Sequence, residues 1–172
     1  KPSRTLLIAF PQSPPRSLFK ICTAAERSSF DASGRVLSQL DRDDGFCHLS
    51  DRSQAPKVAG LFFKGATDLM IIEVDAEKLP GPLKWVTGAM GDPPLSGASA
   101  NPASGTVGHY LLPDGCVHIY GSTGVPAAAI VREASLPLGA DGNHVFPDWV
   151  LSNDARAAPR AWQDLPLWFW RF

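Results

Sequence analysis

The chain has 172 residues, with 16 basic and 17 acidic side chains and a net charge of −1. A chain of this length is expected to form one domain around one hydrophobic core, and its balanced charge argues against nucleic acid as the partner. No apolar run approaches the roughly 18 residues that a membrane-spanning helix needs, which leaves a soluble or peripheral protein.

The cysteines and the N-terminal segment indicate in which cellular compartment the protein is expected. Cys22, Cys47 and Cys116 are an odd number without the close spacing of a zinc or redox motif. Such usage fits a reducing environment, cytoplasmic or organellar, and not secretion. The chain starts at Lys1 and has no acidic residue before Glu26. This pattern fits either the remainder of a mitochondrial or plastid targeting segment or a truncated chain.

The first predicted elements are an arm, a strand and a helix. Residues 1–16 contain four prolines and are expected to be extended. Residues 17–22 predict a strand. Thr23 and Glu26 then match a capping box, in which the two side chains satisfy free backbone N–H groups at a helix start. The predicted helix ends at Gly34.

A second helix and a central strand follow the segment around residue 48. Apolar residues recur with helical spacing after Ser53, which is the predicted N-cap, and the helix closes at Gly65. This start places Pro56 in the first turn, where its missing N–H costs nothing. Residues 69–74 are apolar on both faces apart from one glutamate, which predicts a strand covered on each side.

The second half of the chain contains a long connection. A helical turn is expected over 75–79 and a strand over 83–86. Residues 87–115 are rich in glycine, proline, serine and alanine without periodicity, and predict an insertion that is either functional or disordered. A last strand is predicted over 129–136. This order of elements predicts an α+β domain over 17–147, with two helices and a compact split sheet.

The C-terminal tail, residues 148–172, contains four of the five tryptophans. Such a concentration of aromatic side chains must be buried, either on the domain itself or on a partner. We predict that the arm, the insertion and this tail are the segments through which the protein contacts other proteins.

Two short predicted strands carry the strongest chemical signal. In each, alternate residues share one face and include a histidine and a hydroxyl group: Phe46, His48 and Ser50 in the first, and Cys116, His118 and Tyr120 in the second. Imidazole suits acid–base chemistry or the orientation of a polar ligand. A single histidine in a strand is more often structural. With two such histidines, a shared functional site and a structural role are about equally favoured. Because Cys47 points away from His48, no metal site is predicted.

Other polar residues have simpler interpretations. The charged run 41–44 is most simply a solvated loop. His109, inside the long connection, and His144, in a glycine-rich turn, are assigned no role.

Six short segments, in this order along the chain, resemble the DUF952 family, a domain of unknown function: 18–21, 44–50, 73–75, 83–85, 118–121 and 136–142. The resemblance implies a compact relative of the ADP-ribosyltransferase fold, which holds NAD in a cleft in its better-known members. It places five residues around that cleft: His48 and His118 in catalytic positions, and Lys20, Ser50 and Tyr120 in contact with the ligand. NAD would then be a substrate and not a resident cofactor, and these residues would position its ribose and stabilise charge as the glycosidic bond breaks.

The chain departs from the family pattern at three places. Val86 stands where family members usually carry an acidic residue, Cys116 and Val117 replace a Phe-Pro pair, and the connection 87–115 is longer. The missing carboxylate matters because a developing oxocarbenium centre is commonly assisted by one. Two functions therefore stay open. One is a domain that binds or processes NAD or an ADP-ribose-like ligand, and the other is a non-catalytic accessory subunit of a larger organellar complex.

Overall fold

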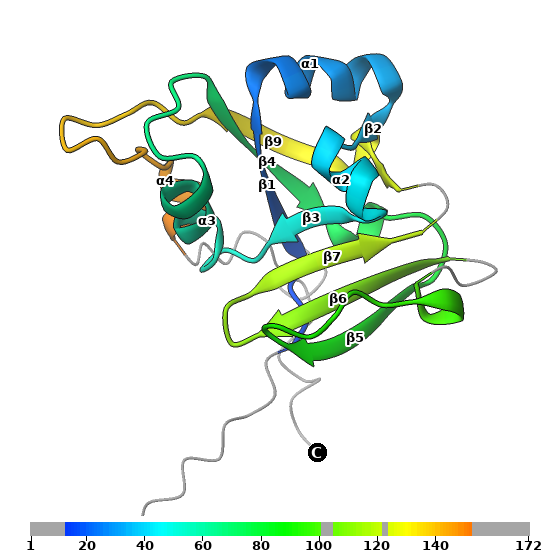
Figure 1. Ribbon diagram of the computed structural model, residues 1–172. Coiled ribbons are helices and arrows are strands. Elements are labelled where there is room, and N and C mark those ends of the chain that lie inside the picture. Colours follow the sequence, from blue (N-terminus) through cyan, green and yellow to red (C-terminus); the bar gives the residue numbers. More distant parts are fainter. Residues whose placement is uncertain (1–12, 101–104, 122–123, 153–172) are drawn as a thin grey trace, which may run out of the picture.

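The computed structural model describes residues 13–100, 105–121 and 124–152. The predicted arm up to residue 12 and the predicted tail after residue 152 lie outside the described residues. The elements, in chain order, are β1 (Ser17–Thr23), α1 (Ala24–Ser33), β2 (Arg35–Val36), α2 (Gln39–Asp44), β3 (Cys47–Ser50), α3 (Ala55–Phe62), β4 (Leu69–Asp75), η1 (Ala76–Lys78), β5 (Leu83–Ala89), η2 (Gly97–Ser99), β6 (Thr106–Leu112), β7 (Cys116–Tyr120), β8 (Val125–Pro126), η3 (Ala127–Ala129), β9 (Ile130–Ser135) and α4 (Asp148–Leu151) (Figure 1).

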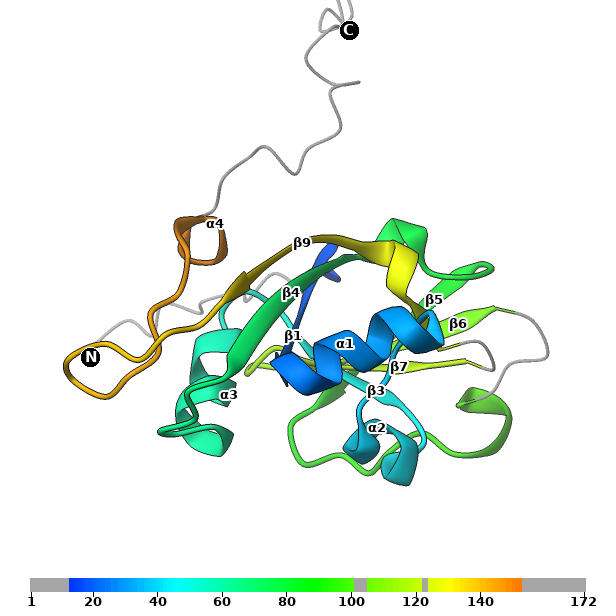
Figure 2. The same ribbon diagram turned by 90° about the horizontal axis from the view of Figure 1, so that it is seen from above.

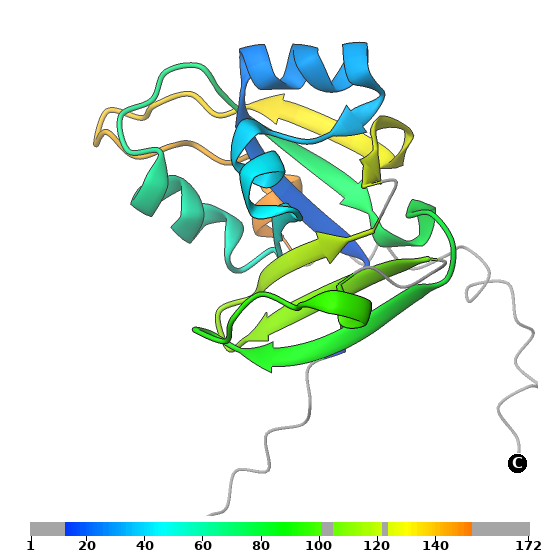
Figure 3. The same cartoon turned by 45° about the vertical axis from the view of Figure 1, so that its right-hand side comes forward.

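The described strands form one large and one small sheet. The large sheet has the order β5-β6-β7-β3-β1-β4-β9, and β2 pairs with β8. Within the large sheet β5 and β6 are parallel, and the other described pairs are antiparallel. β1 and β3 are paired only at Phe19 and Ser50, and the strands on the two sides of this junction run in different directions (Figure 3). The predicted α+β fold is confirmed.

The helices cover different parts of this sheet. α1 and α3 contact β1, and α2 contacts β3. Seen from above, α1 lies beside β1 and β4 while α2 lies beyond β3 (Figure 2). Among the described residues, no helix is long and apolar enough to cross a membrane.

The start of α1 confirms the predicted capping box. The hydroxyl of Thr23 accepts a hydrogen bond from the Glu26 N–H at 3.2 Å, and the Glu26 carboxylate accepts one from the Thr23 N–H at 2.9 Å. Gly34 ends the helix with a φ of 69°, a left-handed conformation that glycine adopts without a steric penalty. Local sequence alone therefore defines both ends of this helix.

The start of α3 differs by one residue from the prediction. Gln54, and not Ser53, is the N-cap, and its side chain makes no capping hydrogen bond. The Asp51 carboxylate instead accepts hydrogen bonds from the N–H groups of Ser53 and Gln54, both at 2.9 Å. This carboxylate satisfies the free N–H groups from outside the helix. Pro56 lies in the first turn as predicted.

The predicted connection over 87–115 contains a strand, so that interpretation was wrong for its second half. β6 pairs in parallel with β5 along its whole length. The glycine-rich composition of this segment did not predict a strand. A Cβ placed on Gly108 would lie 2.5 Å from ring atoms of Trp85, so the indole lies directly over the glycine backbone. Packing of Trp85 across the two strands therefore favours a strand at Gly108, which composition alone did not predict.

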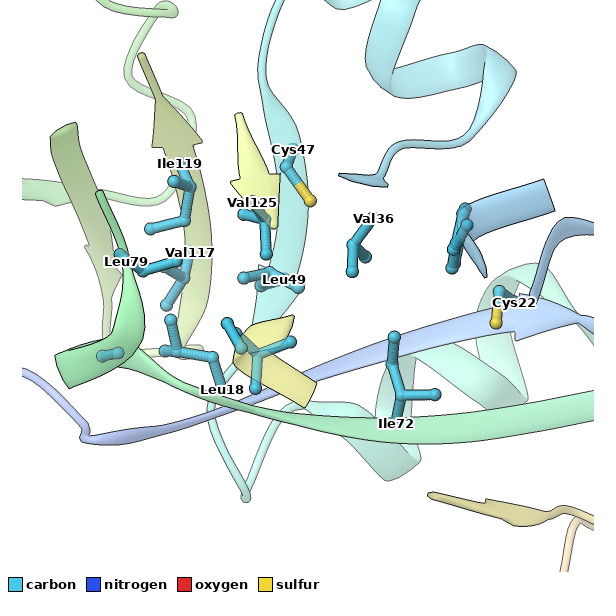
Figure 4. Packing of buried hydrophobic residues seen from close by; sticks show 14 of the residues in the cluster. Leu18, Cys22, Val36, Cys47, Leu49, Ile72, Leu79, Val117, Ile119 and Val125 are labelled. Carbon is cyan, nitrogen blue, oxygen red and sulfur yellow. The ribbon is translucent and has the colours of Figure 1, made fainter. Parts of the chain in front are cut away.

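The main hydrophobic core contains the inward faces of the two predicted histidine strands, as alternation requires. It includes Leu18, Cys22, Val36, Cys47, Leu49, Ile72, Leu79, Val117, Ile119 and Val125 (Figure 4). A second cluster joins α3 and α4 to the other half of the sheet and is built from Phe19, Ile21, Ala55, Ala59, Leu69, Ile71, Leu136 and Val150. The described start of the tail packs on the domain itself. Trp149 stacks on Phe19, with the Arg132 guanidinium 4.8 Å from the centroid of the indole ring.

The turn between β6 and β7 provides a sharp test of packing. Gly115 has a φ of 85°, and a Cβ there would lie 2.1–2.3 Å from atoms of the Asp51 carboxyl group. We expect Gly115→Ala to lower the free energy of unfolding by roughly 2–4 kcal/mol, because backbone strain and overpacking add. The matched control is Gly142→Ala, which has a similar φ of 76° but nothing within 4 Å of the new Cβ. The measurement is urea denaturation. An equal loss of unfolding free energy in the two variants would show that the contact with Asp51 adds nothing.

Candidate functional site

Three histidines form a row across three adjacent strands. His48 of β3 is paired in register with His118 of β7, which is paired in turn with His109 of β6. The ring centroids of His48 and His118 are 5.3 Å apart, and those of His118 and His109 are 6.2 Å apart. We call these three residues the histidine row. The structure thus brings together the two predicted histidines and adds His109, which had been assigned no role.

A buried phenylalanine supports the row from the same face. The ring centroid of Phe46 lies 4.3 Å from that of His118, 4.6 Å from that of His48 and 4.9 Å from that of Tyr120. The hydroxyl of Tyr120 accepts a hydrogen bond from the Leu95 N–H at 3.1 Å. Burial raises the pKa of Tyr120, so its phenol is protonated at neutral pH. The imidazoles of His48 and His118 therefore pack on the aromatic ring of Phe46.

Asp41 is a buried carboxylate that orients His48. Its Oδ1 accepts a hydrogen bond from the His48 N–H at 2.9 Å and lies 2.8 Å from Nδ1 of the same residue. The Lys20 ammonium donates to both carboxylate oxygens, at 2.8 and 2.7 Å, and the Ser38 N–H donates to Oδ2 at 2.8 Å. Burial by itself would raise the pKa of Asp41, but the hydrogen bonds from His48 and the charge of Lys20 outweigh it and hold that pKa well below its ordinary value. Asp41 is therefore ionised.

The interpretation of residues 41–44 as a solvated loop was wrong. They belong to α2, whose N-terminus is a capping box formed by Ser38 and Asp41. The Ser-x-x-Asp pattern directly before a helix is the sequence signal that identifies this role. At the end of the same helix, Oδ2 of Asp44 lies 3.2 Å from Nε2 of His48. His48 is therefore held between two carboxylates.

The other two imidazoles each have one buried nitrogen without a partner in the described part of the chain. Nδ1 of His118 and Nδ1 of His109 are buried and have no hydrogen-bond partner among the described residues. Burial, followed by the neighbouring His48 and His109, lowers the pKa of His118 to about 4. Burial also lowers the pKa of His109, with Asp92 acting in the opposite direction. His118 is therefore neutral at pH 7, beside an imidazole that is paired with carboxylates.

The remaining predicted site residues have different positions. Tyr120 lies beside the row, as described above. Lys20 is 5% exposed and is connected to the row through Asp41. Ser50 is buried at the end of β3 that pairs with β1, two residues from His48. Direct contact with a ligand is therefore easiest to assign to His48, whose side chain is 30% exposed.

The described cysteines do not supply a nucleophile to this site. All three are free thiols, and burial raises the pKa of Cys22 and of Cys47 to about 12. Thiols with such pKa values are poor nucleophiles at neutral pH. Within the described part of the chain, no group of three or more histidine, cysteine or acidic side chains has an arrangement that would hold a metal ion.

Comparison with known proteins places this fold in a family. The model of the DUF952 family, described as a protein of unknown function, matches residues 21–133. The chain belongs to the DUF952 family. The match includes the whole histidine row of this DUF952 protein, together with Asp41. No match was found among curated proteins.

Solved structures similar to this DUF952 protein include two crystal structures of protein CC0527 from Caulobacter crescentus, one of them of a double mutant. They are 29% and 28% identical to it, with a TM-score of 0.55 in both cases. The similarity covers 79% of this chain and 99% of that chain. The family assignment thus supports the fold but names no activity.

Proposed function

We propose that this DUF952 protein binds NAD or an ADP-ribose-like ligand at the histidine row, with His48 as the group that exchanges a proton or a hydrogen bond with the ligand. The observation that carries this proposal is the contact between His48 and the buried, ionised Asp41, next to the neutral His118. A carboxylate behind an imidazole fixes the orientation of the ring and its protonated nitrogen. One supported and one neutral imidazole offer a donor and an acceptor side by side.

The ligand class rests on the resemblance to the ADP-ribosyltransferase fold, and the ligand's chemistry suits the row. Ribose hydroxyl groups both donate and accept hydrogen bonds, so His48 and His118 can each bind one. A pyrophosphate is less suited to the same position, because Asp41 and Asp44 would repel it. We therefore place the ribose next to His48, with the phosphates directed away from α2.

Titration calorimetry with NAD and with ADP-ribose tests this proposal. We expect His48→Ala to weaken binding roughly 10- to 100-fold, because a buried ligand hydroxyl would lose its hydrogen-bond partner. His144→Ala is the matched control. His144 lies outside the row, with Nε2 at 3.0 Å from the carbonyl oxygen of Ala66, and its replacement should leave affinity unchanged. No heat from the wild-type protein at millimolar ligand would exclude the ligand class. Equal affinity of the His48→Ala variant would exclude this face.

A second candidate function is docking as a non-catalytic accessory subunit of a larger organellar complex. It is favoured by Leu61 and Phe62 at the end of α3, which are 72% and 75% exposed. Large apolar side chains at this exposure are commonly covered by a partner when they adjoin one another. The proposed contacts also include the arm, the insertion and the tail. Limited proteolysis of the purified chain tests this candidate, since protection of both terminal segments in a monomer would contradict it.

A further inference from the structure

A third carboxylate, that of Asp92, lies at the far end of the histidine row. Asp92 follows β5, and its Oδ2 accepts a hydrogen bond from the Ala89 N–H at 2.7 Å. A Cβ placed on Gly88 would lie 2.4 Å from Nε2 of His109 and 2.9 Å from Oδ2 of Asp92. Both atoms are therefore beside the same point of β5, where the absence of a side chain on Gly88 gives them room. β5 itself presents Val86 opposite His109, so the carboxylate at this end comes from Asp92.

The row is thus bounded by carboxylates at both ends, with His118 in the centre. Asp41 and Asp44 lie at the His48 end, and Asp92 lies at the His109 end. The groups that act on His118 are His48 from β3, His109 from β6 and, more weakly, Asp44 from α2. A proton on His118 would therefore lie in a desolvated position between two other imidazoles.

Packing alone does not explain the buried nitrogen atoms of His118 and His109. Nδ1 of His118 and Nδ1 of His109 are both buried and unpartnered among the described residues. An unsatisfied buried polar atom destabilises the folded protein, and such atoms call for a functional explanation when they occur in native proteins. An apolar side chain at position 109 would avoid this cost. His109 is nevertheless 3% exposed and directly opposite His118.

We propose that His109, with Asp92 beside it, is a positioning residue of the histidine site that acts together with burial and His48 to keep His118 unprotonated and available as a hydrogen-bond acceptor or base. The site then offers a free imidazole nitrogen in the middle of the row, next to an imidazole that contacts two carboxylates. This inference rests on the proposed function only for the identity of the ligand. The protonation pattern itself is measurable in the protein without any ligand.

The test is an NMR titration of the imidazole resonances of the full chain. In the wild type, His118 should titrate near pH 4. In His109→Phe, which fills the same space without a titratable group, the pKa of His118 should rise measurably above its wild-type value, while burial and His48 still hold it below the ordinary 6.5. His144→Phe is the matched control and should leave His118 unchanged. A His118 that titrates identically in the wild type and in His109→Phe would overturn the proposal.

A second variant guards against a folding defect in His109→Phe. Asp92→Asn removes the charge and keeps the shape, so the pKa of His109 should fall further below its wild-type value because the carboxylate no longer stabilises the protonated imidazole. An unchanged titration of His109 in Asp92→Asn would also overturn the proposal. Correct folding of both variants is verified by their amide spectra.

A ligand measurement separates this inference from the proposed function. With NAD as the probe, His109→Phe should weaken binding more at about pH 5 than at about pH 8, because His118 is neutral at the higher pH in both proteins. Equal weakening at both pH values would indicate a merely structural role and would contradict the inference. If the wild type does not bind NAD, the proposed ligand is wrong, and the imidazole titration still decides the role of His109.

Discussion

Replacing Asp41 with alanine is expected to lower the free energy of unfolding by roughly 3–5 kcal/mol, the cost of leaving one member of a buried ion pair without its partner. Lys20 is 5% exposed, and its ammonium donates to both oxygens of Asp41. The same carboxylate accepts hydrogen bonds from the N–H groups of Ser38 and His48. Urea denaturation at pH 7 measures the loss. The change should also release the orientation of the His48 ring.

Two further variants make this prediction specific. Asp43→Ala changes an exposed carboxylate on the same helix, whose side-chain partner is Gln39, and should alter the unfolding free energy by no more than about 0.5 kcal/mol. The double variant Asp41→Ala with Lys20→Met removes both buried charges and should recover a large part of the lost stability. If Asp41→Ala is no more destabilising than Asp43→Ala, the buried pair does not contribute as described.

Acidification below pH 6.5 is expected to destabilise the native protein through His118. The pKa of His118 is about 4 in the folded protein and 6.5 in an ordinary environment, so the unfolded chain binds the proton first as the pH falls. The contribution is fully present above pH 6.5 and is lost progressively down to about pH 4. The difference between these pKa values corresponds to roughly 3 kcal/mol. Burial of His109 acts in the same direction.

Denaturation curves recorded between pH 7 and pH 4 test this expectation. His118→Phe removes the titrating group and should flatten the dependence of stability on pH in this window, whereas His144→Phe should keep the wild-type slope. The depressed pKa of Asp41 contributes at lower pH, since that stability is present above the ordinary value of 3.8 and is lost below it. A wild-type slope in His118→Phe would show that another group controls the acid response.

Much of the local structure was predictable from the sequence because its causes lie within a few residues of one another. Thr23 and Glu26 are three residues apart, and their capping box defines the start of α1. The alternation of side chains in β3 and β7 separated the histidine face from the face that enters the core. These features depend only on the periodicity of the backbone and on local hydrogen bonds. The histidine face was therefore predictable as a face, although its partners were not.

The tertiary structure alone decided which distant groups meet at that face. His109 lies in the row because β6 pairs with β7. The sequence did not predict β6, which contains Gly108 beneath the Trp85 ring. Asp41 acquired its role through Lys20, a residue of β1 on the other side of the sheet junction. Strand order arises from packing between segments far apart in the chain, and no short motif specifies it. For this reason the two histidine strands were evident from sequence, whereas the carboxylates and the third imidazole became visible only in the folded protein.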